Sequence, residues 1–246
     1  MTALDVSTAT EEPAAAGSGP VLTDEHVVFR LADPERRYLS VGLYQELSRP
    51  RDGQATEWVE GHWTVSLPRP DLVPDGALRM EYAFIVQHAD GGQEFITDPG
   101  NPLVAEGAFG AKSVVEFPGY RRPAWLDQPP HDQGTISWAD LPLPRFADAL
   151  PCGIWQPAGT DPTQPLPLLI VHDGPEFASL ARLTDLLSQA LVARRIPPLR
   201  AALLGPVPGR RDETYSAAAR YADGLAFTAL PWLARTAPQP PDAPPV

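Results

Sequence analysis

Cysteine is nearly missing from the 246-residue sequence, in which Cys152 stands alone. A single thiol excludes an internal disulfide framework and any zinc site built from several cysteines. Basic residues are also scarce, because 19 Lys and Arg stand against 31 Asp and Glu, for a formal net charge of −12 at pH 7. Nucleic acids and anionic membranes attract basic surfaces, so we expect neither as a partner. No histidines have H-x-x-x-H or H-E-x-x-H spacing, and we expect no metal and no cofactor.

Long apolar runs are missing as well. No stretch approaches the roughly 20 apolar residues that a membrane-spanning helix needs. The first 20 residues contain acidic residues but no Lys or Arg, unlike the basic start of a signal peptide. We therefore expect a cytoplasmic protein. Residues 1–20 and the proline-rich residues 236–246 are expected to be disordered tails.

After the first tail, β-branched and aromatic residues alternate with polar ones in short runs bounded by Pro, Gly, Asp or Asn. This pattern predicts strands at Val27–Asp33, Ser40–Leu47, His62–Pro68, Leu78–Ala89, Gln93–Asp98 and Lys112–Phe117. Asp90-Gly91-Gly92 between two of these runs is typical of a hairpin turn. Several short strands with no helical stretch favour a β-sandwich over residues 21–117.

A different pattern follows the proline-rich residues 118–134, which we interpret as a linker. The second half predicts strands at Thr135–Leu141, Phe146–Gln156, Leu166–Gly174 and Leu199–Pro206, and helices at Ser179–Arg195 and Ala217–Ala234. A polar loop is expected at Gly209–Ser216. This order predicts an α/β domain over residues 135–235, with a parallel sheet covered on both faces.

Candidate site residues follow two neighbouring strands of this predicted sheet. His172, Asp173 and Gly174 come after the first strand, and the loop Arg211–Tyr215 after the next. The carboxyl ends of parallel strands share one edge of the sheet, where such proteins build their sites. A backbone N–H beside the glycine could stabilise an oxyanion. Alternatively, His172 and Asp173 only turn the chain, Arg211 pairs with Glu213, and Ser216 caps the next helix.

The order of elements and several phrases resemble the enterochelin-esterase-like branch of the α/β-hydrolases. The phrases are Asp98–Pro102, Phe109–Tyr120, Leu168–Gly174 and Arg211–Tyr215. The resemblance implies an immunoglobulin-like β-sandwich before a catalytic α/β domain, and serine-esterase activity on a small ester substrate. It also places His172, Asp173 and Gly174 beside the oxyanion hole, and matches Arg211, Glu213 and Tyr215 to an Arg-x-Glu-x-Tyr loop.

One feature of that family is missing: the sequence contains no G-x-S-x-G, the turn that carries the nucleophilic serine. Cys152 lies within a predicted strand and is expected to be a buried structural thiol. His26, His62, His88 and His131 have no nucleophile that the sequence places beside them. We therefore assign no catalytic residue, and expect a chain that is truncated before the nucleophile and inactive alone.

The missing segment would also leave the apolar strand Leu166–Val171 at the edge of its sheet, although its composition is typical of an interior strand. Such an edge invites pairing with another chain. We therefore expect self-association through Leu166–Val171, and a second half that is less stable than the sandwich.

Two other interpretations stay open. The chain could be a non-catalytic binding or interaction module that uses the sandwich and an exposed strand edge. Its six Trp residues could supply a carbohydrate-stacking face, although scattered Trp residues are more often core anchors. Alternatively, a separate polypeptide could supply the nucleophile.

Overall fold

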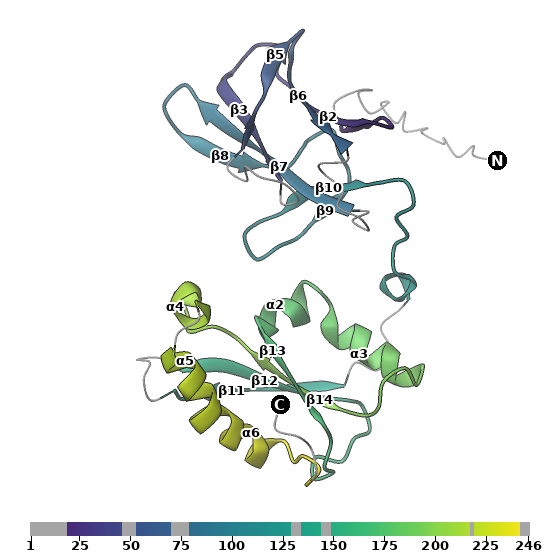
Figure 1. Cartoon of the computed structure of the whole chain (residues 1–246), viewed down its shortest axis with the longest axis vertical. Helices are drawn as coiled ribbons and strands as arrows, with labels where there is room; N and C mark the ends of the chain where they lie inside the picture. Colours follow the sequence, from purple (N-terminus) through teal and green to yellow (C-terminus); the bar gives the residue numbers. More distant parts are fainter. Residues whose placement is uncertain are drawn as a thin grey trace, which may run out of the picture. The chain divides into compact units, whose positions relative to one another are not determined.

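A computed structural model describes residues 19–45, 53–69, 79–128, 134–143, 149–216 and 219–241. The chain divides between Arg121 and Arg122 into two compact units (Figure 1). Almost all of the predicted N-terminal tail, His131 and the last five residues lie outside the described residues. No helix among the described residues has both the length and the apolar character needed to cross a membrane.

The first unit contains two antiparallel sheets. The strands are β1 (Val21–Leu22), β2 (His26–Ala32), β3 (Tyr38–Gln45), β4 (Gln54–Ala55), β5 (Glu57–Val59), β6 (His62–Pro68), β7 (Arg79–His88), β8 (Gln93–Ile96), β9 (Val104–Ala105) and β10 (Lys112–Glu116). One sheet has the order β1-β2-β6-β5, and the other β4-β3-β7-β10-β9, with β8 also paired to β7. All six predicted strands are present, and the four that the sequence missed have only two or three residues each.

The core of the first unit is a single cluster to which both sheets contribute. Phe29 of β2 and Tyr82 of β7 are fully buried, and their rings meet edge to face with centroids 4.8 Å apart. Along β7 the even-numbered residues from Met80 to Val86 all face this core, as the alternation of a strand requires. A shared core between two sheets confirms the sandwich.

The second unit has one sheet of strands β11 (Thr135–Leu141), β12 (Leu150–Gln156), β14 (Arg200–Leu204) and β13 (Leu168–His172), in the order β11-β12-β14-β13. Only β13 and β14 are parallel, because the other pairs run antiparallel. The expectation of a parallel sheet is therefore wrong for two of its three strand pairs. A parallel pair needs a long crossover, and only the helices between β13 and β14 supply one.

The helices cover both faces of this sheet. They are α2 (Gly174–Ser179), α3 (Leu183–Val192), α4 (Arg211–Tyr215), α5 (Ala219–Gly224), the π-helical turn η2 (Leu225–Ala229) and α6 (Leu230–Thr236), with a 3-10 turn η1 (Ala124–Asp127) before the sheet. Leu187 of α3 packs on Trp155 and Leu203 on one face. Tyr221 and Leu233, from the helices after β14, join the core on the other face. The mixed class, a β-sandwich followed by an α/β unit, is confirmed.

Two local predictions in the second unit are wrong. The predicted helix Ser179–Arg195 begins only at Leu183, as α3, because Arg182 before it has a left-handed backbone (φ 53°), and Ser179 is the last residue of α2. The predicted loop Gly209–Ser216 contains helix α4, and Ser216 ends that helix, with its N–H donating to the Asp212 carbonyl. The predicted second helix is present as α5, η2 and α6, with a π-helical turn in its middle.

Candidate functional site

The first site residues lie where β13 meets α2. Asp173 has a left-handed backbone (φ 51°, ψ 35°), which turns the chain from the strand into the helix. Gly174 is buried, and a Cβ on it would collide with the backbone of Leu203 in β14. The glycine therefore lets α2 approach the sheet closely, and this packing accounts for it without a ligand.

Asp173 and Arg211 form a bidentate ion pair across the carboxyl edge of the sheet. The Nε of Arg211 donates to Oδ1 of Asp173 at 2.9 Å, and a terminal nitrogen donates to Oδ2 at 2.6 Å. The hydrogen bonds to Asp173 raise the pKa of Arg211 further above its ordinary value. The guanidinium also lies over the Tyr215 ring at 5.6 Å, so it is held in one orientation by a carboxylate and a ring.

His172 lies in an aromatic cluster with Tyr215 and Tyr221. The ring of His172 meets the two tyrosine rings edge to face, at 5.4 and 5.8 Å between centroids. The Tyr221 hydroxyl shares a hydrogen bond of 3.0 Å with Nδ1 of His172. Among the described residues the other ring nitrogen, Nε2, has no hydrogen-bond partner, and the side chain is exposed. We call His172, Asp173, Arg211, Tyr215 and Tyr221 the His172 cluster.

Burial raises the pKa of both tyrosines. The two hydroxyls therefore stay protonated near neutral pH and can act as donors. The Tyr215 hydroxyl accepts from the Asp173 backbone N–H at 3.2 Å and donates to the Leu204 carbonyl at 3.4 Å. The Asp173 N–H is thus already occupied, and is not free to bind an oxyanion.

Glu213 does not join the His172 cluster. Its carboxylate accepts from Arg220 at 3.1 Å and lies 3.9 Å from Arg210, so the expected pair between Arg211 and Glu213 is not formed. Instead, Glu176 of α2 belongs to these surroundings, because its charge helps to raise the pKa of Tyr215. One of its carboxylate oxygens is buried with no hydrogen-bond partner among the described residues.

In the part of the chain that the structure describes, the His172 ring is hydrogen-bonded to Tyr221 and to no serine or cysteine. Cys152 of β12 is fully buried, and burial raises the pKa of its thiol to about 11. A thiol in that state is a poor nucleophile. The described residues also include no group of three or more His, Cys, Asp or Glu side chains that could hold a metal ion.

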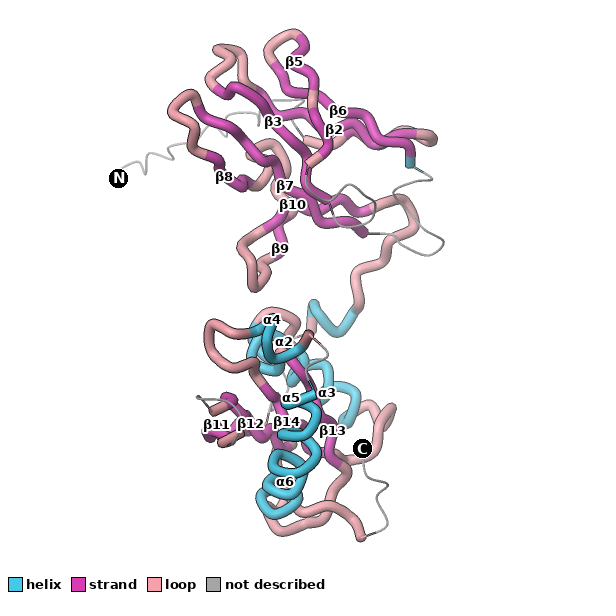
Figure 2. Tube along the Cα trace, turned by 60° about the vertical axis from the view of Figure 1, so that its left-hand side comes forward, coloured by secondary structure: helices cyan, strands magenta, loops and turns pink. Residues whose placement is uncertain are grey.

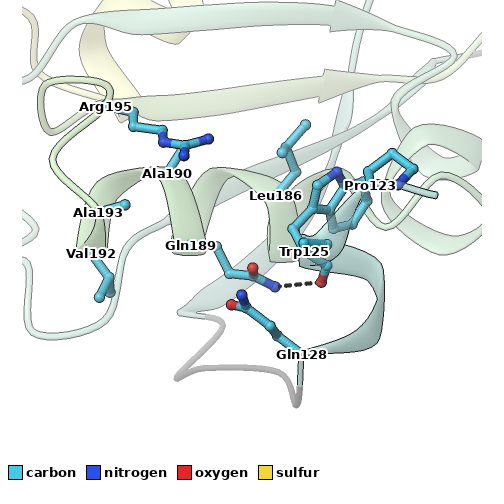
Figure 3. Close-up of a pocket in the computed structure, with 10 residues that line it drawn as sticks. Pro123, Trp125, Gln128, Leu186, Gln189, Ala190, Val192, Ala193 and Arg195 are labelled. Carbon is cyan, nitrogen blue, oxygen red and sulfur yellow. Dashed lines mark hydrogen bonds between the residues drawn. The ribbon is translucent and has the colours of Figure 1, made fainter. Parts of the chain in front are cut away.

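A groove of about 520 Å³ lies elsewhere in the second unit, between η1 and α3 (Figure 3). Trp125 and Leu186 line it, and the Gln189 side chain donates to the Trp125 carbonyl at 3.0 Å. None of its lining residues belongs to the His172 cluster. The groove and the cluster are separate features.

Comparison with known proteins places the fold. No family model and no curated protein matches the sequence. Among solved structures, the enterobactin esterase of Shigella flexneri in the presence of enterobactin matches with a TM-score of 0.62 and 20% identity, over 91% of this chain and 65% of that one. The same enzyme in the presence of 2,3-dihydroxy-N-benzoyl-serine matches with a TM-score of 0.61 and 20% identity, over 91% of this chain and 64% of that one. The enterobactin esterase of Salmonella typhimurium matches with a TM-score of 0.69 and 18% identity, over 93% of this chain and 67% of that one.

The chain has the enterobactin esterase fold. The resemblance that the sequence shows to the enterochelin esterases is therefore confirmed at the level of the fold. The chain spans about two thirds of the length of the enterobactin esterases that it matches, and 65% of the first Shigella structure. Within this enterobactin esterase fold, the His172 cluster lies at the carboxyl ends of β13 and β14, the edge at which sheets of this kind build their sites.

Proposed function

We propose that the chain is a relative of the enterochelin-type carboxylic-ester hydrolases that binds a small ester at the His172 cluster but does not hydrolyse it by itself. The observation that carries the proposal is the position of this cluster, at the carboxyl edge of the parallel strands in an enterobactin esterase fold. The domain assignment is part of the proposal: an immunoglobulin-like sandwich at 21–117, a linker at 118–134 and a partial hydrolase domain at 135–235.

The cluster offers suitable groups for an ester with an aromatic ring. Arg211 uses two of its N–H groups on Asp173, and a guanidinium has five, so donors remain for a ligand carbonyl. The Nε2 atom of His172 has no partner among the described residues and lies on an exposed ring. The half-buried Tyr215 ring offers apolar surface for an aromatic group, whereas the Tyr221 ring is buried in the core. Glu213, which pairs elsewhere, has no role in this site.

Hydrolysis of an ester through a covalent intermediate, as in serine esterases, needs an activated nucleophile within reach of a base. The 246 residues contain no G-x-S-x-G, and the thiol of Cys152 is buried with a raised pKa. We therefore assign ligand binding to the His172 cluster and no catalytic step to this chain alone.

Binding is tested with enterobactin and 2,3-dihydroxy-N-benzoyl-serine, the compounds present in the Shigella structures. Titration calorimetry should show saturable binding, and Arg211→Met or His172→Ala should weaken it about tenfold or more, the loss expected for one charge-assisted hydrogen bond. Arg210→Met is the matched control, because Arg210 is adjacent but lies near Glu213 and not Asp173. Absence of saturable binding, or equal losses in Arg210→Met, contradicts the proposal.

Turnover is tested separately, with an activated nitrophenyl ester and a fluorophosphonate probe. The chain should show no hydrolysis above an inert-protein background and no labelled serine, while the Shigella enterobactin esterase serves as the positive control. Hydrolysis that one substitution abolishes would overturn the assignment of no catalytic step, even if ligand binding is confirmed.

A binding module that uses the sandwich is the second candidate. On β3 the side chains of Val41 and Leu43 are buried, so Tyr44 points to the outer face. There its ring meets the exposed Phe95 edge to face at 5.0 Å, and the Lys112 ammonium lies 5.6 Å from it. An exposed aromatic pair of this kind can stack on a sugar or an aromatic ligand. If this candidate holds, Phe95→Ala abolishes ligand binding and Arg211→Met leaves it unchanged.

A further inference from the structure

The sheet of the second unit has one edge strand of unusual composition. β13 pairs only with β14 and lies at the end of the sheet among the described strands, as Figure 2 shows. Its five residues, Leu-Leu-Ile-Val-His, include no Lys, Arg, Asp or Glu. Leu169 is 39% exposed, and Ile170 and Val171 are half-buried. An apolar strand therefore has one side without a neighbour.

The other sheet edges in the described chain are protected in the usual ways. In the first unit β1, β4 and β9 have two residues each, β5 has three, and β8, which pairs only with β7, has four with the charged Glu94 among them. In the second unit the opposite edge is β11, whose exposed positions include Thr135, Ser137 and Asp140. Short strands and polar or charged edges discourage pairing with another chain. β13 has neither kind of protection.

The backbone of β13 shows which residues are available for pairing. The N–H of Arg200 in β14 donates to the Pro167 carbonyl at 2.9 Å. Because backbone groups alternate in direction along a strand, Leu169 and Val171 also face β14, and Leu168, Ile170 and His172 face outward. The Asp173 N–H agrees with this alternation, since it bonds to Tyr215, which follows β14. The outward backbone groups have no partner among the described residues.

We propose that two copies of this chain pair through β13, antiparallel and about a two-fold axis at Ile170. The outward residues are symmetric about Ile170, so that Ile170 exchanges backbone hydrogen bonds with its copy and Leu168 pairs with His172 of the other copy. The two sheets then form one continuous sheet.

A second copy fits this edge better than a charged partner strand. β13 has no Lys, Arg, Asp or Glu, and its His172 faces Leu168 of the other copy and not the other His172. The adjacent Asp173 is neutralised by Arg211. Two copies therefore meet without a like-charge pair, although the whole chain carries a net charge of −12. Leu169 faces Val171 of the other copy, and both bury apolar surface that is now partly exposed.

The first test is the oligomeric state of the full chain, measured by sedimentation velocity over a wide concentration range. We expect a monomer–dimer equilibrium that stops at the dimer, because a two-fold interface closes on itself. Leu169→Lys places an ammonium opposite Val171 of the other copy, and should raise the dimer dissociation constant about a hundredfold. Ser137→Lys makes the same change on the exposed opposite edge, and should leave the dimer unchanged. Circular dichroism confirms that both variants are folded.

The second test uses hydrogen exchange and needs no variant that might fail to fold. In the dimer the Ile170 amide should be protected as strongly as that of Val171. On dilution to the monomer the outward amides of Leu168, Ile170 and His172 should become fast, whereas the Val171 amide should stay protected because it faces β14. A monomer at every concentration, an open-ended polymer, or a dimer with a fast Ile170 amide would each overturn the proposal. So would a monomer that instead binds a separate polypeptide along β13.

Discussion

The two units differ in how their sheets end. In the sandwich, two sheets enclose one core, and the strands at their edges have two to four residues. In the α/β unit a single sheet has a separate core on each face, and one edge is the five-residue apolar strand β13. A sandwich buries its apolar surface within itself, whereas the second unit leaves part of it at an open edge. We therefore expect the second unit to be the less stable of the two.

The units also use opposite charges to hold their loops. In the sandwich the buried Asp33 carboxylate accepts from the Trp63 indole at 2.9 Å and from the backbone N–H groups of Arg37 and Tyr38. In the second unit the buried Arg200 guanidinium donates to four backbone carbonyls, those of Asp161, Pro162, Gln164 and Pro238. The Asp33 carboxylate and the Arg200 guanidinium thus each fix loop backbone by hydrogen bonds. Each side chain can be substituted separately.

The largest expected effect is the protection of Cys152, which reports on the second unit only. Because burial raises its pKa to about 11, a thiol reagent near pH 8 should react with the native chain on the order of a hundredfold or more slowly than with the unfolded chain. In increasing denaturant, labelling should be complete while the amides of β7 in the sandwich are still protected from hydrogen exchange. Simultaneous loss of both protections would show that the units unfold together, and would remove the stability difference.

Arg200→Met should destabilise the second unit by about 3 kcal/mol, because it removes the buried guanidinium that donates to four backbone carbonyls. Denaturant unfolding monitored by Cys152 labelling measures this loss. Arg195→Met is the matched control: the Arg195 side chain has no hydrogen bond or ion pair among the described residues, and its change should stay within about 0.5 kcal/mol. Equal effects of the two substitutions would contradict a specific role for Arg200.

Asp33→Ala should destabilise the sandwich by about 2 kcal/mol, since the Trp63 indole and two backbone N–H groups lose their acceptor. Asp24→Ala, at an exposed position, is the control and should have little effect. Unfolding of the sandwich, followed by hydrogen exchange in β7, separates the two. The second unit should be unaffected by either change.

The effect of Asp33→Ala should also depend on pH. Burial raises the pKa of Asp33, but the hydrogen bonds from Trp63, Arg37 and Tyr38 outweigh burial, and leave the pKa below its ordinary value. A carboxylate with a lowered pKa in the folded state stabilises the fold above its ordinary pKa of about 3.9, and this contribution disappears as the pH falls through the lowered value. The difference between the wild type and Asp33→Ala should therefore be constant near neutral pH and shrink in acid. A difference that grows in acid would contradict this account.

The contribution of Asp98, in the same unit, to stability should have the opposite pH dependence. Burial raises the pKa of this carboxyl, although it accepts from the Tyr82 hydroxyl at 2.6 Å. Its contribution is present below the ordinary carboxyl pKa and is lost as the pH rises through the raised value. Asp98→Asn should remove this decrease, which the pH dependence of unfolding of the sandwich measures.

Local patterns were sufficient to predict most strands, but not the details set by tertiary contacts. Alternation is a property of the strand itself, so β6 and β11 were predicted with their observed bounds. Helix α4 was not, because its five polar residues have no apolar periodicity and it is held by the pair between Arg211 and Asp173. The start of α3 after Arg182 was also not predictable, because the helical leucine spacing continues through Arg182. There the Arg182 side chain donates to Asp185 and to the Leu126 carbonyl, which is distant in sequence.

The candidate site shows the same division. Asp173 and Arg211 lie at one edge of the sheet, as predicted, because the carboxyl ends of parallel strands share an edge. This rule could not show that Glu213 points to Arg220, because that depends on the direction of α4. Tyr221 was missed because only the position of α5 against the sheet brings its hydroxyl to His172. The one sequence signal for Tyr221 was that it is a polar residue on the apolar face of a predicted helix.

The smallest expected effect is at this site. Tyr221→Phe keeps the ring in the core but removes the hydroxyl that bonds to Nδ1 of His172, and should destabilise the second unit by about 1 kcal/mol. Nitrogen-15 shifts of the His172 ring should change, because the tautomer and orientation of the imidazole lose their fixed partner. Tyr120→Phe in the first unit removes a hydroxyl with no partner among the described residues, and should change neither quantity. Unchanged His172 shifts in Tyr221→Phe would mean that the hydroxyl does not position the imidazole, and the site would then rest on Asp173 and Arg211 alone.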